Sequence, residues 1–175
     1  MKQTAYIVSK ILFYIVSALL VFVMIFSMLS YLEYKFGVSI PFVEVFENHS
    51  KIKVPILGLR IGVPFNFSIL IMWTAMTYYA VYFYAFKEFL KIFVKKNMFE
   101  TKSLKRLHFF LVLNILPIIY IIIFTASFLI KGVSIRLEDD YFIVFAHLVI
   151  AFLIYLYLDA LKKGKQIQQE NDLTI

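Results

Sequence analysis

The sequence contains no cysteine, and it is poor in glycine and in charged residues. A chain without cysteine forms no disulfides, binds no metal through thiolates and has no cysteine nucleophile. Hydrophobic residues make up 62% of the 175 positions and charged residues 17%, whereas apolar residues, glycine included, make up about 45–50% of a typical soluble domain. A soluble domain of this length cannot bury so many apolar side chains, and a disordered chain has far fewer of them. The sequence therefore predicts an integral membrane protein.

Four runs without Asp, Glu, Lys or Arg cover residues 11–32, 61–86, 107–130 and 141–158. Each is long enough for a membrane-spanning helix, which needs about 20 apolar residues. Pro64 moves the start of the second helix to about residue 65. The first run is too long for the core of a signal peptide, so we expect it to be retained. The predicted fold is all-α, a four-transmembrane-helix bundle in a single membrane domain over residues 1–175, with helices at about 8–32, 65–94, 103–130 and 140–162.

The segments between the runs differ in their content of Lys and Arg. The N-terminus, the second loop (87–106) and the C-terminal segment together hold 12 of these residues, and the other two loops hold six. Because basic loops stay in the cytoplasm, this bias predicts a multi-pass protein of the bacterial cytoplasmic (inner) membrane with both termini and the second loop inside. The net charge of +7 is then a topology signal and an attraction to anionic lipid headgroups, and we expect no direct nucleic-acid binding.

The extracytoplasmic loop, residues 33–64, combines β-branched and aromatic residues with the polar turn at residues 47–50. This pattern is compatible with a small β-hairpin that caps the outer face, with Pro41 and Pro55 at edges or bulges. The loop is interpreted either as a connector that shields helix ends or as a lid that senses an external ligand. The second loop continues the second helix as a basic amphipathic extension, which is either a snorkelling helix end or a docking surface.

The sequence offers few groups for chemistry inside the membrane. The four runs hold no charged residue, and their two histidines, His108 and His147, differ too much in predicted depth to share a haem. His147 is interpreted as a hydrogen-bonded packing residue, and Asn114, close to Pro117, as a hydrogen-bonding partner of a neighbouring helix. We found no phosphate loop, zinc motif or nucleophile elbow. We therefore expect no enzymatic activity and no catalytic, cofactor-binding or metal-binding residues.

Two stretches resemble a known family. Residues 97–107, Asn-Met-Phe-Glu-Thr-Lys-Ser-Leu-Lys-Arg-Leu, resemble the N-P-F-x-x-x-N-x-x-R-L segment of an uncharacterised bacterial family, domain of unknown function 2975. The end of the chain, residues 164–175, resembles the family's terminus, G-x-x-L-x-E-E-N-D-L-T-V. Met98, Ser103 and Gln169 depart from these patterns. The number of spans and the total length also match.

The resemblance implies a partner, because members of this family are typically encoded beside a small helix-turn-helix regulator. It suggests an accessory or signalling protein that controls or tethers such a cytosolic regulator. Both motifs fall on the predicted cytoplasmic side, where they either bind the partner or simply pack and cap helix ends. The alternative function is a small transporter or an immunity-type membrane protein. The candidate partner surface consists of Asn97, Phe99, Lys105, Arg106, Gly164, Glu170, Asn171, Asp172 and Leu173.

Overall fold

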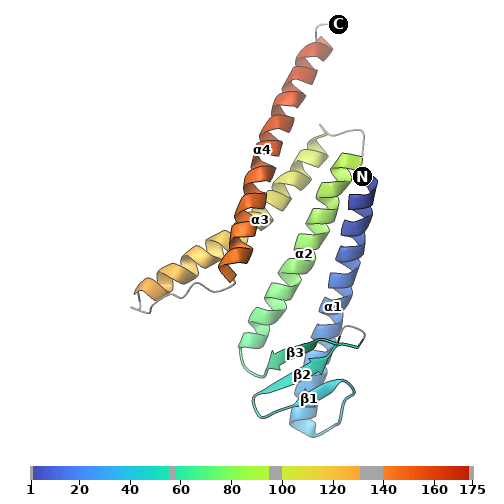
Figure 1. Ribbon diagram of the computed structural model, residues 1–175, viewed down its shortest axis with the longest axis vertical. Helices are drawn as coiled ribbons and strands as arrows, with labels where there is room; N and C mark the ends of the chain where they lie inside the picture. The colour runs from blue at the N-terminus through green and yellow to red at the C-terminus, as the bar shows by residue number, and fades with distance from the viewer. Residues whose placement is uncertain (1, 56–57, 95–99, 131–139, 174–175) are drawn as a thin grey trace. The chain divides into compact units, whose positions relative to one another are not determined.

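The computed structural model describes residues 2–55, 58–94, 100–130 and 140–173 (Figure 1). In chain order the elements are α1 (Lys2–Phe36), β1 (Val43–Val45), β2 (His49–Lys53), β3 (Arg60–Pro64), α2 (Ser68–Val94), α3 (Thr101–Ile130) and α4 (Asp140–Leu173). All four helices are long and apolar enough to cross a membrane. The predicted fold class is confirmed: the chain has four membrane-spanning helices and a small antiparallel β-element in the first connecting loop.

The limits of α2 and α3 agree with the predicted ones, whereas those of α1 and α4 differ. α2 and α3 begin and end within three residues of their predicted limits, while α1 begins earlier, at Lys2. α4 was predicted to end near residue 162, but it continues through Gly164 to Leu173. A single glycine costs a helix only about 1 kcal/mol relative to alanine, and no proline follows it to end the helix. The segment predicted as a tail, 163–175, is therefore helical as far as Leu173.

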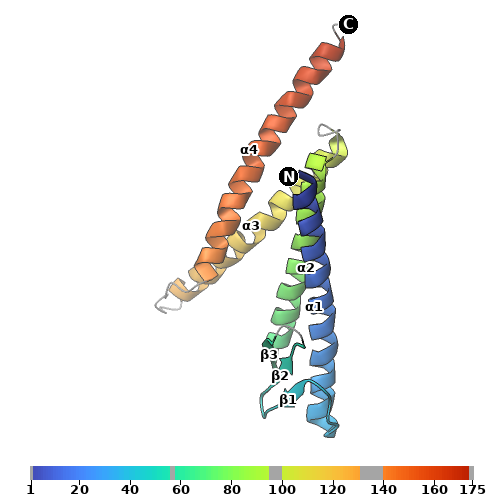
Figure 2. The ribbon, with the colours of Figure 1, turned by 45° about the vertical axis from the view of Figure 1, so that its right-hand side comes forward.

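The chain divides into two compact units, whereas the sequence predicts one membrane domain. The first unit described here is Ile7–Tyr84. In it α1 and α2 run side by side in opposite directions, with the sheet at the end where α1 finishes and α2 begins (Figures 1 and 2). Aromatic side chains lie between the helices: Phe13 contacts Tyr84 edge-on, with ring centroids 5.7 Å apart. Such bulky side chains replace the glycine contacts that α1 and α2 lack.

The β-element has one strand more than the predicted hairpin. The three strands form an antiparallel sheet in the order β1-β2-β3, in which Val43 pairs with Ile52 and Lys53 with Arg60. Alternate residues of β2, Ser50 and Ile52, are buried, as expected for a strand with one covered face. Pro64 ends β3 at the sheet edge, a position that proline tolerates.

The other unit comprises Met1–Tyr6 and Ala85–Ile175. Within it α3 and α4 pack against each other, and the end of α2 lies beside the first turns of α3. Its core includes Phe110, Leu107, Ile92 and Ile154. This unit contains all the residues of the predicted partner surface.

Candidate functional site

A cluster of charged side chains, which we call the Glu88 cluster (Lys87, Glu88, Lys91 and Arg106), joins the end of α2 to the start of α3. Arg106 Nη2 lies 3.1 Å from Glu88 Oε2, and Lys91 Nζ and Lys87 Nζ lie 3.6 Å and 4.0 Å from Glu88 Oε1. Glu88 is only 9% exposed. A carboxylate removed from water to this extent requires paired cations, and the cluster supplies three.

Aromatic rings surround this cluster on its apolar side. Phe110 of α3 packs on Phe86 and Phe89 of α2, at 5.7 Å and 5.2 Å between ring centroids. Phe93 of α2 stacks on Tyr157 of α4 at 5.2 Å. These contacts fasten all three helices together at one end of the unit.

A second polar contact lies in the packed interface of α3 and α4. Asn114 is fully buried and His147 is 6% exposed. The Asn114 Nδ2 group donates to the Phe110 carbonyl at 2.8 Å, so that its Oδ1 atom accepts from His147 Nδ1 at 3.0 Å. The predicted roles of both residues, an amide that bonds a neighbouring helix and a histidine that packs, agree with this geometry.

The end of α4 contacts the beginning of α3. Lys165 Nζ donates to Thr101 Oγ1 at 3.2 Å. Residues 100–107 and 164–173, the described parts of two motifs far apart in the chain, therefore lie at the same end of this unit. Between the two helices a groove of about 390 Å³ is lined by side chains of both.

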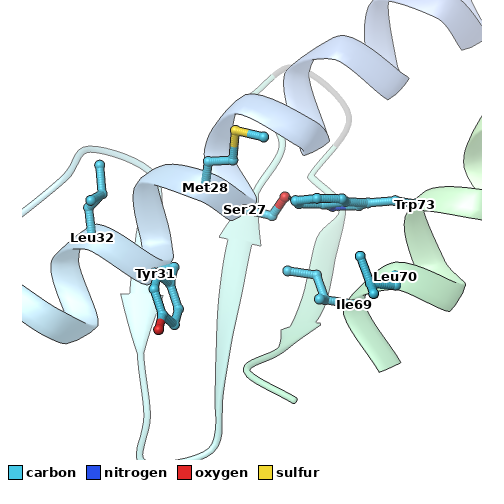
Figure 3. Close-up of a pocket in the computed structure, with 7 residues that line it drawn as sticks. All are labelled: Ser27, Met28, Tyr31, Leu32, Ile69, Leu70 and Trp73. Carbon is cyan, nitrogen blue, oxygen red and sulfur yellow. The ribbon is translucent and has the colours of Figure 1, made fainter. Parts of the chain in front are cut away.

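The unit Ile7–Tyr84 has an apolar pocket of its own, of about 410 Å³ (Figure 3). Met28 and Leu32 of α1 and Ile69 and Leu70 of α2 contribute to its wall. Trp73 Nε1 reaches across to donate to Ser27 Oγ at 3.0 Å, and Ser27 in turn donates to the carbonyl of residue 24 at 3.0 Å. This indole is the protein's one tryptophan, and its bond ties α1 to α2.

Within the ranges that the structure describes, no group of three or more His, Asp or Glu side chains is arranged to hold a metal ion. At this end of the second unit, the Glu88 cluster joins α2 to α3. Residues 166–171 of α4 are exposed. Comparison with known proteins agrees with the resemblance seen in the sequence. Residues 40–175 match the family described as Protein of unknown function (DUF2975). The chain belongs to the DUF2975 family. Searches of curated proteins and of solved structures found no match.

The DUF2975 match begins at residue 40, so that it covers the sheet, α2, α3 and α4 but not α1. It includes both motifs and every residue of the Glu88 cluster. Of the motif residues, Lys105 is exposed at the start of α3 and Gly164 is half-buried in α4, while Glu170 and Asn171 are exposed. Asp172 and Leu173 belong to α4, and Asn97 and Phe99 lie outside the described residues.

The structure gives Arg106 of the DUF2975 motif an internal partner. Its side chain is 24% exposed, and its guanidinium is held by Glu88. Sequence analysis placed Arg106 on the partner surface and gave Glu88 no role. The end of α2 buries Ala85, Glu88 and Ile92, three positions at helical spacing. Glu88 stands at the middle position of this apolar stripe, beside Lys87 and Lys91, and this pattern in the sequence indicates a paired acid.

Proposed function

We propose that this DUF2975 protein is a non-enzymatic component of the bacterial inner membrane that binds a cytosolic helix-turn-helix regulator through the protruding end of α4. The observation that carries the proposal is the length of α4. Its 34 residues extend about 51 Å at 1.5 Å per residue, and the hydrocarbon core of a bilayer is about 30 Å thick. About 20 Å of α4 therefore extends beyond the membrane.

The protruding part is polar and little covered by the rest of the chain. After Leu161, which is buried, the described side chains of α4 are half-buried or exposed, and residues 166–171 are all exposed. Helices that are polar on every side obtain little stability from packing, and short isolated helices are marginal in water. A partner that packs along this segment supplies the missing contacts. Residues 170–173, the described part of the family's terminal motif, form the last turn of α4.

The orientation proposed for this end is cytoplasmic. It holds the beginning of α3 and the end of α4, which belong to the basic segments of the sequence. Lys and Arg near the ends of membrane-spanning helices favour the cytoplasmic side. The Glu88 cluster also belongs to this end of the unit, where it holds the end of α2 against the beginning of α3.

The proposal is tested by co-purification of the full-length protein with the regulator encoded beside it. Two variants alter the tip of α4 outside the membrane: deletion of residues 170–175, and the double substitution Glu170→Gln/Asp172→Asn. The matched control, Gln166→Ala/Gln168→Ala, removes two polar side chains from the same helix outside the motif. We expect both tip variants to lower the affinity for the regulator at least about tenfold, which is ~1.4 kcal/mol, and the control to leave it unchanged.

Failure of the intact protein to retain the regulator contradicts the proposal. So does retention that is equal for the wild type and both tip variants. Normal transcription combined with altered sensitivity of a deletion strain to a toxic peptide or solute favours the alternative, a small transporter or immunity-type protein.

A further inference from the structure

The groove between α3 and α4 changes from polar to apolar along its length. Its lining residues are Thr101, Leu104, Lys105, His108, Phe109, Val112, Leu158 and Lys162. On α3, Thr101, Lys105, His108 and Val112 follow one another at steps of four, three and four residues, so they share one face of the helix. On α4, Leu158 and Lys162 are one turn apart and also share a face.

The polar end carries positive charge that the described residues do not neutralise. Lys105 and Lys162 are both exposed, and among the residues that the structure describes neither is paired with a carboxylate. The nearest acid on α4, Asp159, is held by Lys163 at 2.8 Å and does not line the groove. Lys165 reinforces the same end, where it is hydrogen-bonded to Thr101.

The apolar end faces the hydrocarbon region. Val112 lies about 16 Å from Thr101 along α3, at 1.5 Å per residue, within the uncharged run of that helix. Phe109 is 45% exposed and Val112 is 40% exposed, while Leu158 forms a buried floor on α4. The groove therefore presents cations near the membrane surface and an apolar wall below them.

We propose that this groove binds one anionic phospholipid, with its phosphate against Lys105 and Lys162 and an acyl chain along Phe109, Val112 and Leu158. The charge distribution selects this occupant: basic pockets between membrane helices attract anionic headgroups, and the adjoining apolar wall matches the chains of the same molecule. A soluble phosphate would use only the polar half of the groove. The proposal is independent of the regulator and of which side of the membrane this end faces.

The test is native mass spectrometry of the full-length protein, released from nanodiscs that contain equal amounts of phosphatidylglycerol and phosphatidylcholine. We expect the wild type to retain phosphatidylglycerol preferentially. The variant Lys105→Gln/Lys162→Gln should lose about tenfold of this preference. The matched control, Lys2→Gln/Lys102→Gln, removes the same charge from two exposed positions of the same unit outside the groove and should keep it. Glycerol phosphate should not displace the lipid.

A third variant, Val112→Trp, fills the apolar end and leaves both lysines in place. It should displace the retained lipid while the helical circular dichroism stays that of the wild type, so the test does not depend on the folding of the lysine variant. An equal loss of preference in the Lys2/Lys102 control overturns the proposal, because general surface charge then explains the binding. Displacement of the lipid by glycerol phosphate, or unchanged retention in Val112→Trp, also overturns it.

Discussion

The carboxylate of Glu88 and the guanidinium of Arg106 lie 3.1 Å apart and connect the last turns of α2 to the second turn of α3. Their side chains are 12% and 24% exposed, so the pair is largely removed from water. Exposed ion pairs contribute little to stability, but removing one partner of a buried pair leaves an uncompensated charge. This contact is a polar connection between α2 and α3.

Substitution of Glu88 is expected to cost more than substitution of Arg106. Glu88→Ala leaves three cations without their shared acid, whereas after Arg106→Ala the carboxylate keeps Lys91 at 3.6 Å and Lys87 at 4.0 Å. We expect a loss of about 2 kcal/mol for Glu88→Ala and about 1 kcal/mol for Arg106→Ala. Thermal unfolding of the two variants in detergent measures this difference.

The exchanged pair, Glu88→Arg/Arg106→Glu, provides a sharper control. It restores one opposite-charge contact but places an arginine beside Lys87 and Lys91, so we expect it to remain less stable than the wild type. Full recovery of stability in the exchanged protein would show that only the Glu88–Arg106 contact matters and that the lysines have no part in the cluster.

The bond between Asn114 and His147 should appear as a coupling between α3 and α4. Asn114→Leu and His147→Leu each leave a buried polar atom without this partner, so each should destabilise the protein. The double variant should lose less than the sum of the two, with a coupling energy of about 0.6 kcal/mol, the mean measured between membrane helices, and no more than about 1.7 kcal/mol, the maximum. Unfolding in detergent of the four proteins gives this value, and strictly additive losses would contradict the contact.

The sheet contains a carboxyl group whose pKa depends mainly on one lysine. The Lys53 ammonium, which hydrogen-bonds to Glu44 across β1 and β2, is the main cause of a pKa of Glu44 below its ordinary value. Because the folded pKa is lowered, the contact stabilises the sheet above the unfolded pKa, and this stabilisation is lost as the pH falls through the folded pKa. The sheet should therefore loosen in acid, and Glu44→Gln should remove this part of the pH dependence.

Carbon-13 NMR titration of the Glu44 carboxyl group measures the effect directly. Lys53→Met should raise the pKa of Glu44, and Arg60→Met should raise it less, because Arg60 acts only through its charge and not through a hydrogen bond. An equal rise in both variants would contradict a dominant hydrogen bond from Lys53.

The sequence predicted most helix limits because charged side chains are costly in the membrane and mark where each apolar run ends. The same signal could not locate the end of α4, which continues for 11 residues beyond its predicted limit at 162. Beyond Asp159 the helix is in a polar environment, where charge no longer marks a boundary. The third strand, Arg60–Pro64, was not predicted: Pro64 was taken as the limit of the second helix, whereas it ends a strand at the sheet edge.

The candidate site was predicted in outline only. The basic loop and the terminal motif were placed on one side of the membrane, and the bond between Lys165 and Thr101 brings α3 and α4 together there. The pairing of Glu88 with Arg106 depends on how α2 packs on α3, which residue spacing along one chain does not determine. The partner of Asn114 was unspecified for the same reason. The role of Arg106 changed most, from a surface residue to a partner of a buried acid.

The central claim, that the end holding the α3 start and the α4 tip faces the cytoplasm, is tested most directly by cysteine accessibility. Because the chain has no native cysteine, single variants need no altered background. Gln168→Cys on the exposed α4 tip and Lys51→Cys on β2 are treated in intact cells with a membrane-impermeant maleimide. In intact cells we predict labelling of the Lys51→Cys variant and none of the Gln168→Cys variant. The Gln168→Cys variant should be labelled once the membrane is opened. Labelling of the Gln168→Cys variant in intact cells would contradict the proposed orientation and, with it, the cytosolic partner.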